Sequence, residues 1–449
     1  MVKGKGFGKA AQPSLSRQIR QAAIHFRQGD WARCRQICEQ LLSDAGSDSV
    51  GSARRGSPLG GADLSDPGAA IARVQAHALL GQIEEGAGRY PAAMLHYQQA
   101  IVICPPAAPA SLAAEVHALL GRVLRQMGER KQAQLLFEQA LNRDPQLLMA
   151  RVGLADLLQM RGEFAAAVAH YLQAWQGSQQ EADIPYQIGM CFWKQGQPEA
   201  ASPWFRRALS LQPDHSDARY MLAILGELPL PDRTPPAWVS RLFDEYAPRF
   251  EQHLLEKLNY QGPQALRQGI LAVAAAQGSP PGFERALDLG CGTGLAGSQV
   301  RPYVKQLWGV DLSARMLEIA QHKGIYDHLV QGDLLDLLHQ TSERYDLILA
   351  ADVFIYLGDL AQVFPACARV LNAGGLLAFT VEVGSTPGYE LGSTTGRFAH
   401  SPSYVLQQAE EAGLDPVYHQ NFTLRREGEA DVPGAVWCLR RSRQRCGAH

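Results

Sequence analysis

Residues 287–297 read LDLGCGTGLAG and place four glycines in eleven positions directly after an apolar run. Glycine adopts backbone conformations that other residues avoid, so a loop of this composition lets the chain approach a ligand closely. Several classes of ligand are bound by loops of this kind, nucleotide phosphates among them. The spacing of the glycines and the residues downstream therefore indicate which of these ligands the loop binds.

The loop lies within an alternation of strand-like and helix-like segments that runs from residue 263 onward. Apolar runs typical of buried strands occupy residues 285–290, 306–312, 328–334, 345–352 and 375–382, with helical runs between them. This pattern predicts a Rossmann-like α/β domain with a mostly parallel, seven-stranded sheet, closed by an antiparallel hairpin from residues 416–426 and 434–441. A ligand of such a sheet binds at the carboxyl ends of the strands.

Two common ligands of glycine loops do not fit this spacing. A dinucleotide loop has its third glycine three positions after the second, where this chain has Leu295. A phosphate-binding P-loop needs a Lys-Ser or Lys-Thr pair, and none follows the glycines. The loop does have Asp288 just before it and Asp311, 21 residues beyond Gly290, placed to accept hydrogen bonds from ribose hydroxyls. These features favour an adenosyl cofactor without phosphates, S-adenosylmethionine.

The loop resembles motif I of the class I S-adenosylmethionine-dependent methyltransferases, and later segments of residues 240–442 follow the same family pattern. The resemblance implies a cofactor site made by three groups of residues. The methionine part would contact Asp288 and the loop residues Gly290, Cys291, Gly292 and Gly294, the ribose and adenine would contact Asp311, Leu312, Met316, Asp333 and Leu334, and Ala351 and Asp352 would face both cofactor and substrate.

Residues 242–260 precede the first strand and resemble a helix that covers the cofactor in this family. Tyr246 and Phe250 are four residues apart, so they share one face of a helix. We expect them to close over the cofactor. The alternative is an amphipathic helix that simply packs on the sheet.

Methyl transfer needs alignment and a deprotonated acceptor but no metal, and no cluster with metal-ligand spacing is found in the sequence. A general base would come from the acceptor side, where His400 and Tyr404 are candidates. Tyr356 is the third catalytic candidate, at the strand ends opposite, with Asp352 and Glu382. A histidine bonded to a backbone carbonyl, near a helix capped by Ser401, is the alternative for His400. Arg397 would pair with a substrate carboxylate, or with Glu382 or Glu390.

The first half of the chain is a repeat. Gly121, Ala155 and Gly189 are 34 residues apart, and the aromatic residues Phe137, Tyr171 and Phe205 keep the same interval. Small residues let two helices approach, an aromatic ring fills the space between them, and Gly or Pro ends each helix. The period resembles that of the tetratricopeptide repeat (TPR), which implies an all-α solenoid. By its place in this repeat, the Cys34 and Cys38 pair is expected to pack rather than bind metal.

These patterns predict five segments. Residues 1–15 form a basic flexible terminus, residues 16–226 the repeat array with a mobile insert at about 43–69, residues 227–238 a Pro-rich linker, residues 239–442 the methyltransferase domain, and residues 443–449 a flexible tail.

The composition limits the possible partners. The 42 basic and 44 acidic residues leave a net charge of −2, which argues against nucleic acid, and no apolar run is long enough to span a membrane. The eight scattered cysteines indicate a reduced compartment, so we expect a cytoplasmic protein. Its groove of repeats would bind a protein or peptide, and the methyl acceptor would be a small molecule or a protein. The alternative is an adaptor whose second domain binds the cofactor without turnover.

Overall fold

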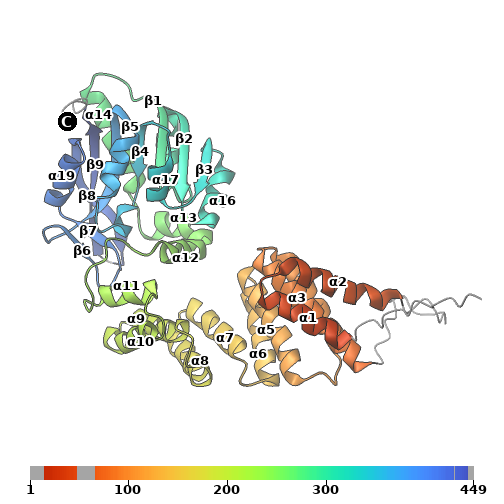
Figure 1. The fold of residues 1–449 in the computed structure, drawn as a ribbon. Helices are drawn as coiled ribbons and strands as arrows, with labels where there is room; N and C mark the ends of the chain where they lie inside the picture. Colours follow the sequence, from red (N-terminus) through yellow and green to blue (C-terminus); the bar gives the residue numbers. More distant parts are fainter. Residues whose placement is uncertain (1–14, 48–65, 429, 443–449) are drawn as a thin grey trace, which may run out of the picture. The chain divides into compact units, whose positions relative to one another are not determined.

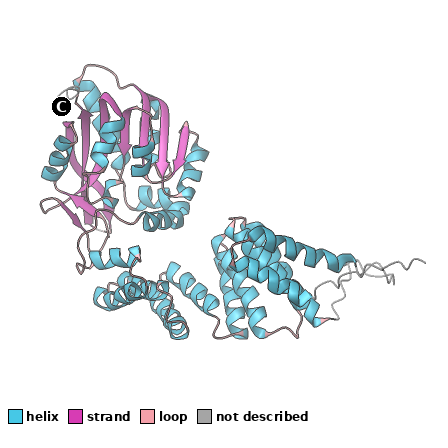
Figure 2. Ribbon diagram, viewed as in Figure 1, coloured by secondary structure: helices cyan, strands magenta, loops and turns pink. Residues whose placement is uncertain are grey.

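The computed structural model describes residues 15–47, 66–428 and 430–442 and divides the chain into two compact units, Met1–Pro213 and Asp214–His449. The first unit is helical, and the second is built around a sheet (Figures 1 and 2). The predicted combination of a helical repeat array and an α/β domain is therefore confirmed. The predicted flexible segments 1–15 and 443–449 lie almost entirely outside the described residues.

The first unit consists of antiparallel helix pairs that follow one another along the chain. They are α1 (Leu15–Arg27), α2 (Trp31–Ser47), α3 (Pro67–Gly86), α4 (Tyr90–Ile103), α5 (Ala110–Gln126), α6 (Arg130–Arg143), α7 (Leu148–Met160), α8 (Phe164–Gly177), α9 (Asp183–Lys194) and α10 (Pro198–Leu211). Because α2 extends to Ser47 and α3 begins at Pro67, the two ends of the predicted insert are helical. Cys34 and Cys38 are fully buried against α1 and α3, as expected.

The repeated glycines make room for the repeated aromatic rings. A Cβ atom added at Gly121 would lie 3.0 Å from the Phe137 ring, and one added at Gly189 would lie 2.6 Å from the Phe205 ring. Phe137 and Phe205 are both fully buried. The small-residue and aromatic positions of the sequence period therefore correspond to one recurring contact between the two helices of each pair.

Gly153 of α7 contacts the same Phe137 ring from the next helix pair. A Cβ atom at this position of α7 would lie 2.4 Å from Phe137, so we expect Gly153→Ala to destabilise the first unit by about 1–3 kcal/mol. Gly177→Ala is the matched control because no atom lies within 4 Å of its added Cβ. Hydrogen exchange of α6 and α7 peptides measures the difference, and equal exchange rates in the two variants would contradict the packing argument.

The second unit is a nine-stranded sheet in the order β3-β2-β1-β4-β5-β7-β6, and the β8–β9 hairpin joins it through β9, which pairs antiparallel with β5. The strands are β1 (Phe283–Leu289), β2 (Val304–Asp311), β3 (His328–Gln331), β4 (Tyr345–Ala350), β5 (Leu371–Val383), β6 (Tyr389–Leu391), β7 (Phe398–His400), β8 (Leu414–Glu427) and β9 (Ala430–Arg441). Seven of these match the predicted sheet. The short strands β6 and β7 were not predicted.

Helices cover both faces of this sheet (Figure 2). The helices of this unit are α11 (Ser216–Ile224), α12 (Pro236–Tyr246), α13 (Phe250–Gln252), α14 (Gly262–Ala276), α15 (Leu295–Val300), α16 (Ala314–Lys323), α17 (Leu334–Gln340), α18 (Val363–Val370) and α19 (Pro402–Glu411). Along β4, Ile348 packs into one hydrophobic cluster and its neighbours Leu347 and Leu349 into another. Each central strand is thus apolar on both faces, as a doubly wound sheet requires.

The division between the units differs from the predicted boundary at residue 226. Helix α11, which we expected to end the repeat array, belongs to the second unit. Tyr220 of α11 donates a hydrogen bond to the carbonyl oxygen of Gly396 (2.7 Å) and shares another with the Thr234 hydroxyl (2.8 Å). Thr234 is buried within the Pro-rich segment. The predicted linker is therefore packed on the α/β domain, because its polar groups bond to that domain.

Candidate functional site

The glycine loop turns tightly between β1 and α15. Gly290, Gly292 and Gly294 have φ angles of 58°, 53° and 89°, which are left-handed conformations that favour glycine. A Cβ atom at Gly290 would lie 2.7 Å from Val353. At Gly292, by contrast, the only described atom within 4 Å of such a Cβ is in the Phe250 ring, at 3.9 Å. A side chain at Gly292 would therefore make an ordinary van der Waals contact with Phe250 and would meet no closer described atom.

Asp311 ends β2 and is held beside the loop. Its carboxylate accepts hydrogen bonds from the backbone N–H groups of Gly292 and Ser313, each at 2.8 Å. Burial raises the pKa of Asp311, and these two hydrogen bonds oppose that rise. The two backbone bonds fix the carboxylate beside the glycine loop, because β1 and β2 are parallel neighbours.

Asp288 is buried beneath the loop. One carboxylate oxygen, Oδ2, accepts a hydrogen bond from the Tyr326 hydroxyl (2.7 Å), and the other has no hydrogen-bond partner among the described residues. Burial raises the pKa of Asp288 to about 7. Sequence reasoning missed Tyr326, although Gly309 in the middle of β2 was a signal: a Cβ atom there would lie 3.0 Å from the Tyr326 ring.

Cys291, within the loop, is also buried. Its backbone N–H donates to the carbonyl oxygen of Val310 (3.0 Å), which ties the loop to the end of β2.

The predicted adenine side lies at the ends of β2 and β3. Asp333 caps α17 by accepting a hydrogen bond from Leu335 N (2.9 Å), and it forms an ion pair with Arg233. Leu312 and Leu334 are half-buried and Met316 is buried. Arg233 was missed because it lies in the Pro-rich segment, 100 residues away in sequence.

Aromatic rings of the segment before β1 reach the loop. The Phe250 ring lies 5.3 Å from that of Tyr246 and 5.9 Å from that of Phe243, and Phe243 in turn lies 5.7 Å from Tyr356. The segment is not one helix, since the short 3₁₀ turn Ala247–Arg249 interrupts it. Phe250 thus faces the glycine loop, and Phe243, which the sequence analysis did not select, connects it to Tyr356.

A partly buried ion cluster of Asp352, Glu382, Arg397, Arg425 and Glu427 occupies the carboxyl ends of β4 and β5. Arg425, only 1% exposed, pairs with Asp352 (3.2 Å), Glu427 (2.8 Å) and Glu382. Burial raises the pKa of Asp352 and of Glu382, and the Arg425 charge opposes both shifts. The cluster lies beside the loop because Val353, next to Asp352, contacts Gly290.

The sequence predicted only some of the ion pairs in this cluster. Arg397 pairs with Glu427 and, at 4.0 Å, with Glu382, so one of its expected carboxylate partners is found. The other, Glu390, instead accepts hydrogen bonds from Ser385 and Thr386. Arg425 and Glu427 were missed because the β8 sequence resembles an ordinary edge strand.

His400 and Tyr404 take part in packing. His400 Nε2 donates to the carbonyl oxygens of Leu357 (2.9 Å) and Gly358 (3.1 Å), and burial lowers the pKa of the ring to about 4. The Tyr404 hydroxyl donates to Asp359 (2.9 Å) and accepts from the N–H of Leu360 (3.0 Å). Ser401 caps α19. This geometry matches the alternative of a carbonyl-bonded histidine, and of the three predicted catalytic residues only Tyr356 lies beside the ion cluster.

The buried His400 gives the second unit a pH-dependent stability. Between pH of about 4 and about 6.5 the unfolded chain binds a proton at His400 that the folded chain does not, so the free energy of unfolding falls as the pH falls through this window. His400→Gln removes this contribution. We expect wild type to lose more stability than the variant between pH of about 7 and about 5 in denaturant unfolding. Equal losses would contradict the assignment.

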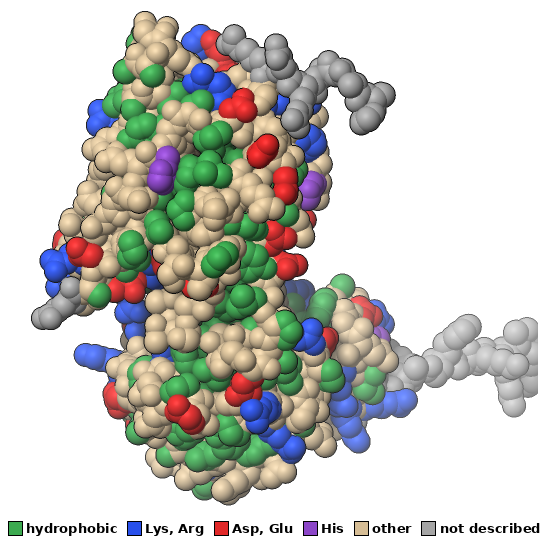
Figure 3. Space-filling model, turned by 90° about the vertical axis from the view of Figure 1, so that its left-hand side faces the viewer, with side chains coloured by type: hydrophobic (Ala, Val, Ile, Leu, Met, Phe, Trp, Pro, Cys, Tyr) green, Lys and Arg blue, Asp and Glu red, His purple; other side chains and the backbone are tan. Residues whose placement is uncertain are grey.

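Within the described residues, no group of three or more His, Cys, Asp or Glu side chains is placed to hold a metal ion. No described helix has both the length and the apolar character needed to cross a membrane. On the face shown in Figure 3, acidic and basic side chains are intermixed with hydrophobic ones.

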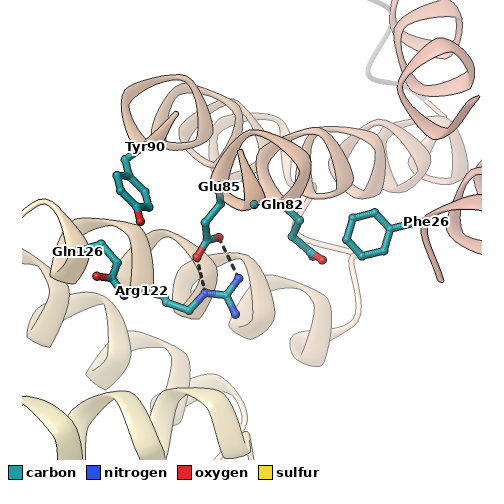
Figure 4. A pocket seen from close by; sticks show the side chains of 7 residues that line it. Phe26, Gln82, Glu85, Tyr90, Arg122 and Gln126 are labelled. Carbon is teal, nitrogen blue, oxygen red and sulfur yellow. Dashed lines mark hydrogen bonds and ion pairs between the residues drawn. The ribbon is translucent and has the colours of Figure 1, made fainter. Parts of the chain in front are cut away.

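The repeats carry a pocket of their own, with a volume of about 370 Å³. It is lined by Phe26, Gln82, Glu85, Gly86, Tyr90, Arg122 and Gln126. Arg122 and Glu85 form a two-point ion pair in it, at 2.7 and 2.9 Å, with Tyr90 and Phe26 to either side (Figure 4). The pocket thus offers aromatic and charged groups to a ligand.

An equivalent ion pair recurs one repeat later with its charges exchanged. Arg125 and Asp156 hold the positions of Glu85 and Arg122, respectively, and they also form an ion pair. Tyr97 donates to Glu85 (2.9 Å) and Tyr171 donates to Asp156 (2.6 Å), so a tyrosine supports the acidic member of each pair. This ladder links the first helices of successive repeats.

Comparison with known proteins agrees with this geometry. Residues 287–379 match the family described as "Methyltransferase domain", and residues 119–182 and 182–215 match families described as "Tetratricopeptide repeat". The methyltransferase match begins one residue before Asp288 and ends within β5, so it includes the glycine loop, Asp311 and Asp352.

Curated methyltransferases match about a third of the chain. A malonyl-[acyl-carrier protein] O-methyltransferase from Enterobacter lignolyticus is 30% identical over 32% of this chain and 52% of its own. Methyltransferase-like protein 27 from Homo sapiens is 39% identical over 38% of this chain and 66% of its own. A solved magnesium protoporphyrin IX methyltransferase from Synechocystis, 17% identical, covers 46% of this chain and 100% of its own at a TM-score of 0.37.

The chain spans about half or less of the first curated relatives that it matches. The matches nevertheless agree on both parts of the sequence. Residues 287–379 thus belong to the methyltransferase domain family, and the chain joins this domain to tetratricopeptide repeats.

Proposed function

We propose that this chain transfers a methyl group from S-adenosylmethionine to an acceptor that the repeats recruit or orient. The observation that carries the proposal is the hydrogen bond from the backbone N–H of Gly292 to the Asp311 carboxylate. A carboxylate is fixed at the end of β2 beside a left-handed glycine loop, and the Phe250 ring is the nearest described neighbour of a Cβ built at Gly292, at 3.9 Å. A dinucleotide or nucleoside triphosphate would instead need the phosphate-binding residues that this loop lacks.

The residues present fit the cofactor. Asp311 would accept the ribose hydroxyls, the backbone of Gly290 and Gly292 would hold the methionine part, and Phe250 would exclude water. Asp288, with one oxygen unpartnered, would support the loop from below. When bound, the sulfonium supplies an activated methyl group, so the protein contributes alignment rather than bond activation.

The ion cluster supports an acceptor site at the ends of β4 and β5. We assign proton acceptance to Asp352, because burial raises its pKa while Arg425 favours its ionised form, and because Val353 next to it contacts the glycine loop. Tyr356 would orient the acceptor, since its pKa is raised by burial and its hydroxyl stays protonated at neutral pH. His400 and Tyr404 have no direct part in this proposal.

The repeats support a role in acceptor recruitment. Arrays of this kind present a surface to other polypeptides, and the pocket around Glu85 and Arg122 offers one place for such contact. The acceptor would therefore be a protein, or a small molecule carried by one.

The proposal is tested in two steps with the intact chain. Calorimetry with S-adenosylmethionine tests the cofactor, and transfer of a labelled methyl group to fractions of a cell lysate tests turnover. Binding together with label on a protein or small-molecule fraction is the expected result. Absence of binding would overturn the proposal, and binding without transfer to any fraction would favour an adaptor instead.

A further inference from the structure

A short strap, residues 232–234, is bonded to the carboxyl edge of the sheet in the stretch that leads from α11 to α12. Every residue of the strap contributes a backbone contact to the segment after β4. The carbonyl oxygen of Asp232 accepts from the N–H groups of Gly358 (2.8 Å) and Asp359 (2.9 Å). Arg233 forms a β-bridge with Leu357, and Thr234 N donates to the backbone carbonyl oxygen of Tyr356 (2.9 Å).

The Arg233 side chain extends from this strap to Asp333. Asp333 Oδ1 accepts the capping hydrogen bond from Leu335 N and lies 3.5 Å from Arg233 Nη1, and Oδ2 pairs with Arg233 Nη2. The Asp333 side chain is 12% exposed and that of Arg233 is 29% exposed, so water only partly screens the pair. Both oxygens of this carboxylate are therefore engaged by the chain itself.

We propose that Arg233 competes with the adenine amino group of the cofactor for Asp333, so that docking of the strap and binding of the cofactor oppose each other. The inference rests on the proposed function, in which Asp333 is the acceptor for that amino group. Because the helix cap holds Oδ1, Oδ2 is the oxygen left for a ligand, and Arg233 holds Oδ2. The adenine amino group must share Oδ2 or displace the guanidinium.

The competition at Asp333 also involves the backbone of the strap. The backbone bonds of residues 232–234 set where the Arg233 side chain begins, and Thr234 is tied through Tyr220 to Gly396. Release of Arg233 therefore removes one side-chain contact of a segment whose backbone also bonds to Tyr356, beside the ion cluster. In this arrangement the side-chain contact of the strap changes when the adenine of the cofactor binds.

The experiment measures binding of S-adenosylhomocysteine to the intact chain by calorimetry. This ligand has no net charge, so salt acts mainly on the ion pair. For Arg233→Met we expect about threefold tighter binding than for wild type, the effect of removing one partly exposed competing pair. Arg241→Met is the matched control, because Arg241 pairs with Asp217 and both lie outside the adenine side. We expect it to bind like wild type.

Salt gives a second measurement that needs no variant. Raising the salt from about 0.05 M to about 0.5 M weakens the pair, so wild-type affinity should rise toward that of Arg233→Met while the variant stays constant. In Asp333→Asn the Arg233→Met change should have no further effect. If wild type binds but Arg233→Met binds equally or more weakly, or if wild-type affinity does not rise with salt, the competition is refuted while the proposed function stands. If wild type does not bind, the proposed function itself fails.

Discussion

Asp311→Ala is expected to weaken S-adenosylmethionine binding by at least about 100-fold. The carboxylate would accept two hydrogen bonds from the ribose, and hydrogen bonds to a charged group contribute about 1.5–3 kcal/mol each. Their loss corresponds to about 3 kcal/mol or more, hence to two orders of magnitude in the dissociation constant. The same change also removes the partner of Gly292 N, so the loop loses one of its fixed points. Isothermal titration calorimetry measures the effect.

Two further variants separate this role from a general loss of charge. Asp336→Ala removes an exposed carboxylate from α17, and we expect it to bind like wild type. Asp311→Asn keeps one oxygen acceptor and should give an intermediate affinity. A wild-type affinity in Asp311→Ala would refute the assignment of the ribose site and, with it, the observation on which the proposed function depends.

Arg425→Met is expected to destabilise the second unit by about 3–5 kcal/mol. Arg425 is 1% exposed and pairs with three carboxylates, so its removal takes the paired cation from Asp352 and leaves Glu382 with Arg397 alone, 4.0 Å away. Denaturant unfolding, followed by hydrogen exchange of β5 and β8 peptides, measures the loss in this unit alone.

The loss should grow with pH. Without Arg425, burial raises the pKa of both carboxyl groups further above their unfolded values. The folded variant then binds protons that the unfolded chain has released, so its stability falls as the pH rises through the raised pKa values. We therefore expect a smaller loss at a pH of about 5 than at about 8. A loss independent of pH would contradict the charge argument.

The neighbouring residue on β8 is the control. Arg426 is 54% exposed and pairs with Asp431, which is itself 60% exposed, at 3.1 Å. Exposed pairs of this kind contribute little, so Arg426→Met should change the stability by less than about 1 kcal/mol. Because the two arginines follow each other on one strand, a similar effect of both changes would show that β8 is sensitive to any substitution.

Short-range patterns predicted most of the architecture. Gly121 recurs as a small residue every 34 positions, and Phe137 recurs as an aromatic residue at the same interval. This period predicted the helix pairs, because the small residue of one helix leaves room for the aromatic ring of the next. The sequence also predicted the positions of the glycine loop and of Asp311. Both lie at the ends of strands that the apolar pattern had already located. The predicted linker was less successful, because prolines do not show whether a segment is packed.

The sequence by itself thus determined the elements and the glycine loop, whose spacing is local and follows from the backbone. Only the tertiary structure decided which distant side chains meet. It brought Arg425 to Asp352 and Arg233 to Asp333, and it placed Tyr326 under Asp288. In the folded chain His400 also forms hydrogen bonds to two backbone carbonyl groups. A buried charge or ring nitrogen needs a partner, but the sequence does not say which residue will be near enough to supply one, because that depends on strand order and packing.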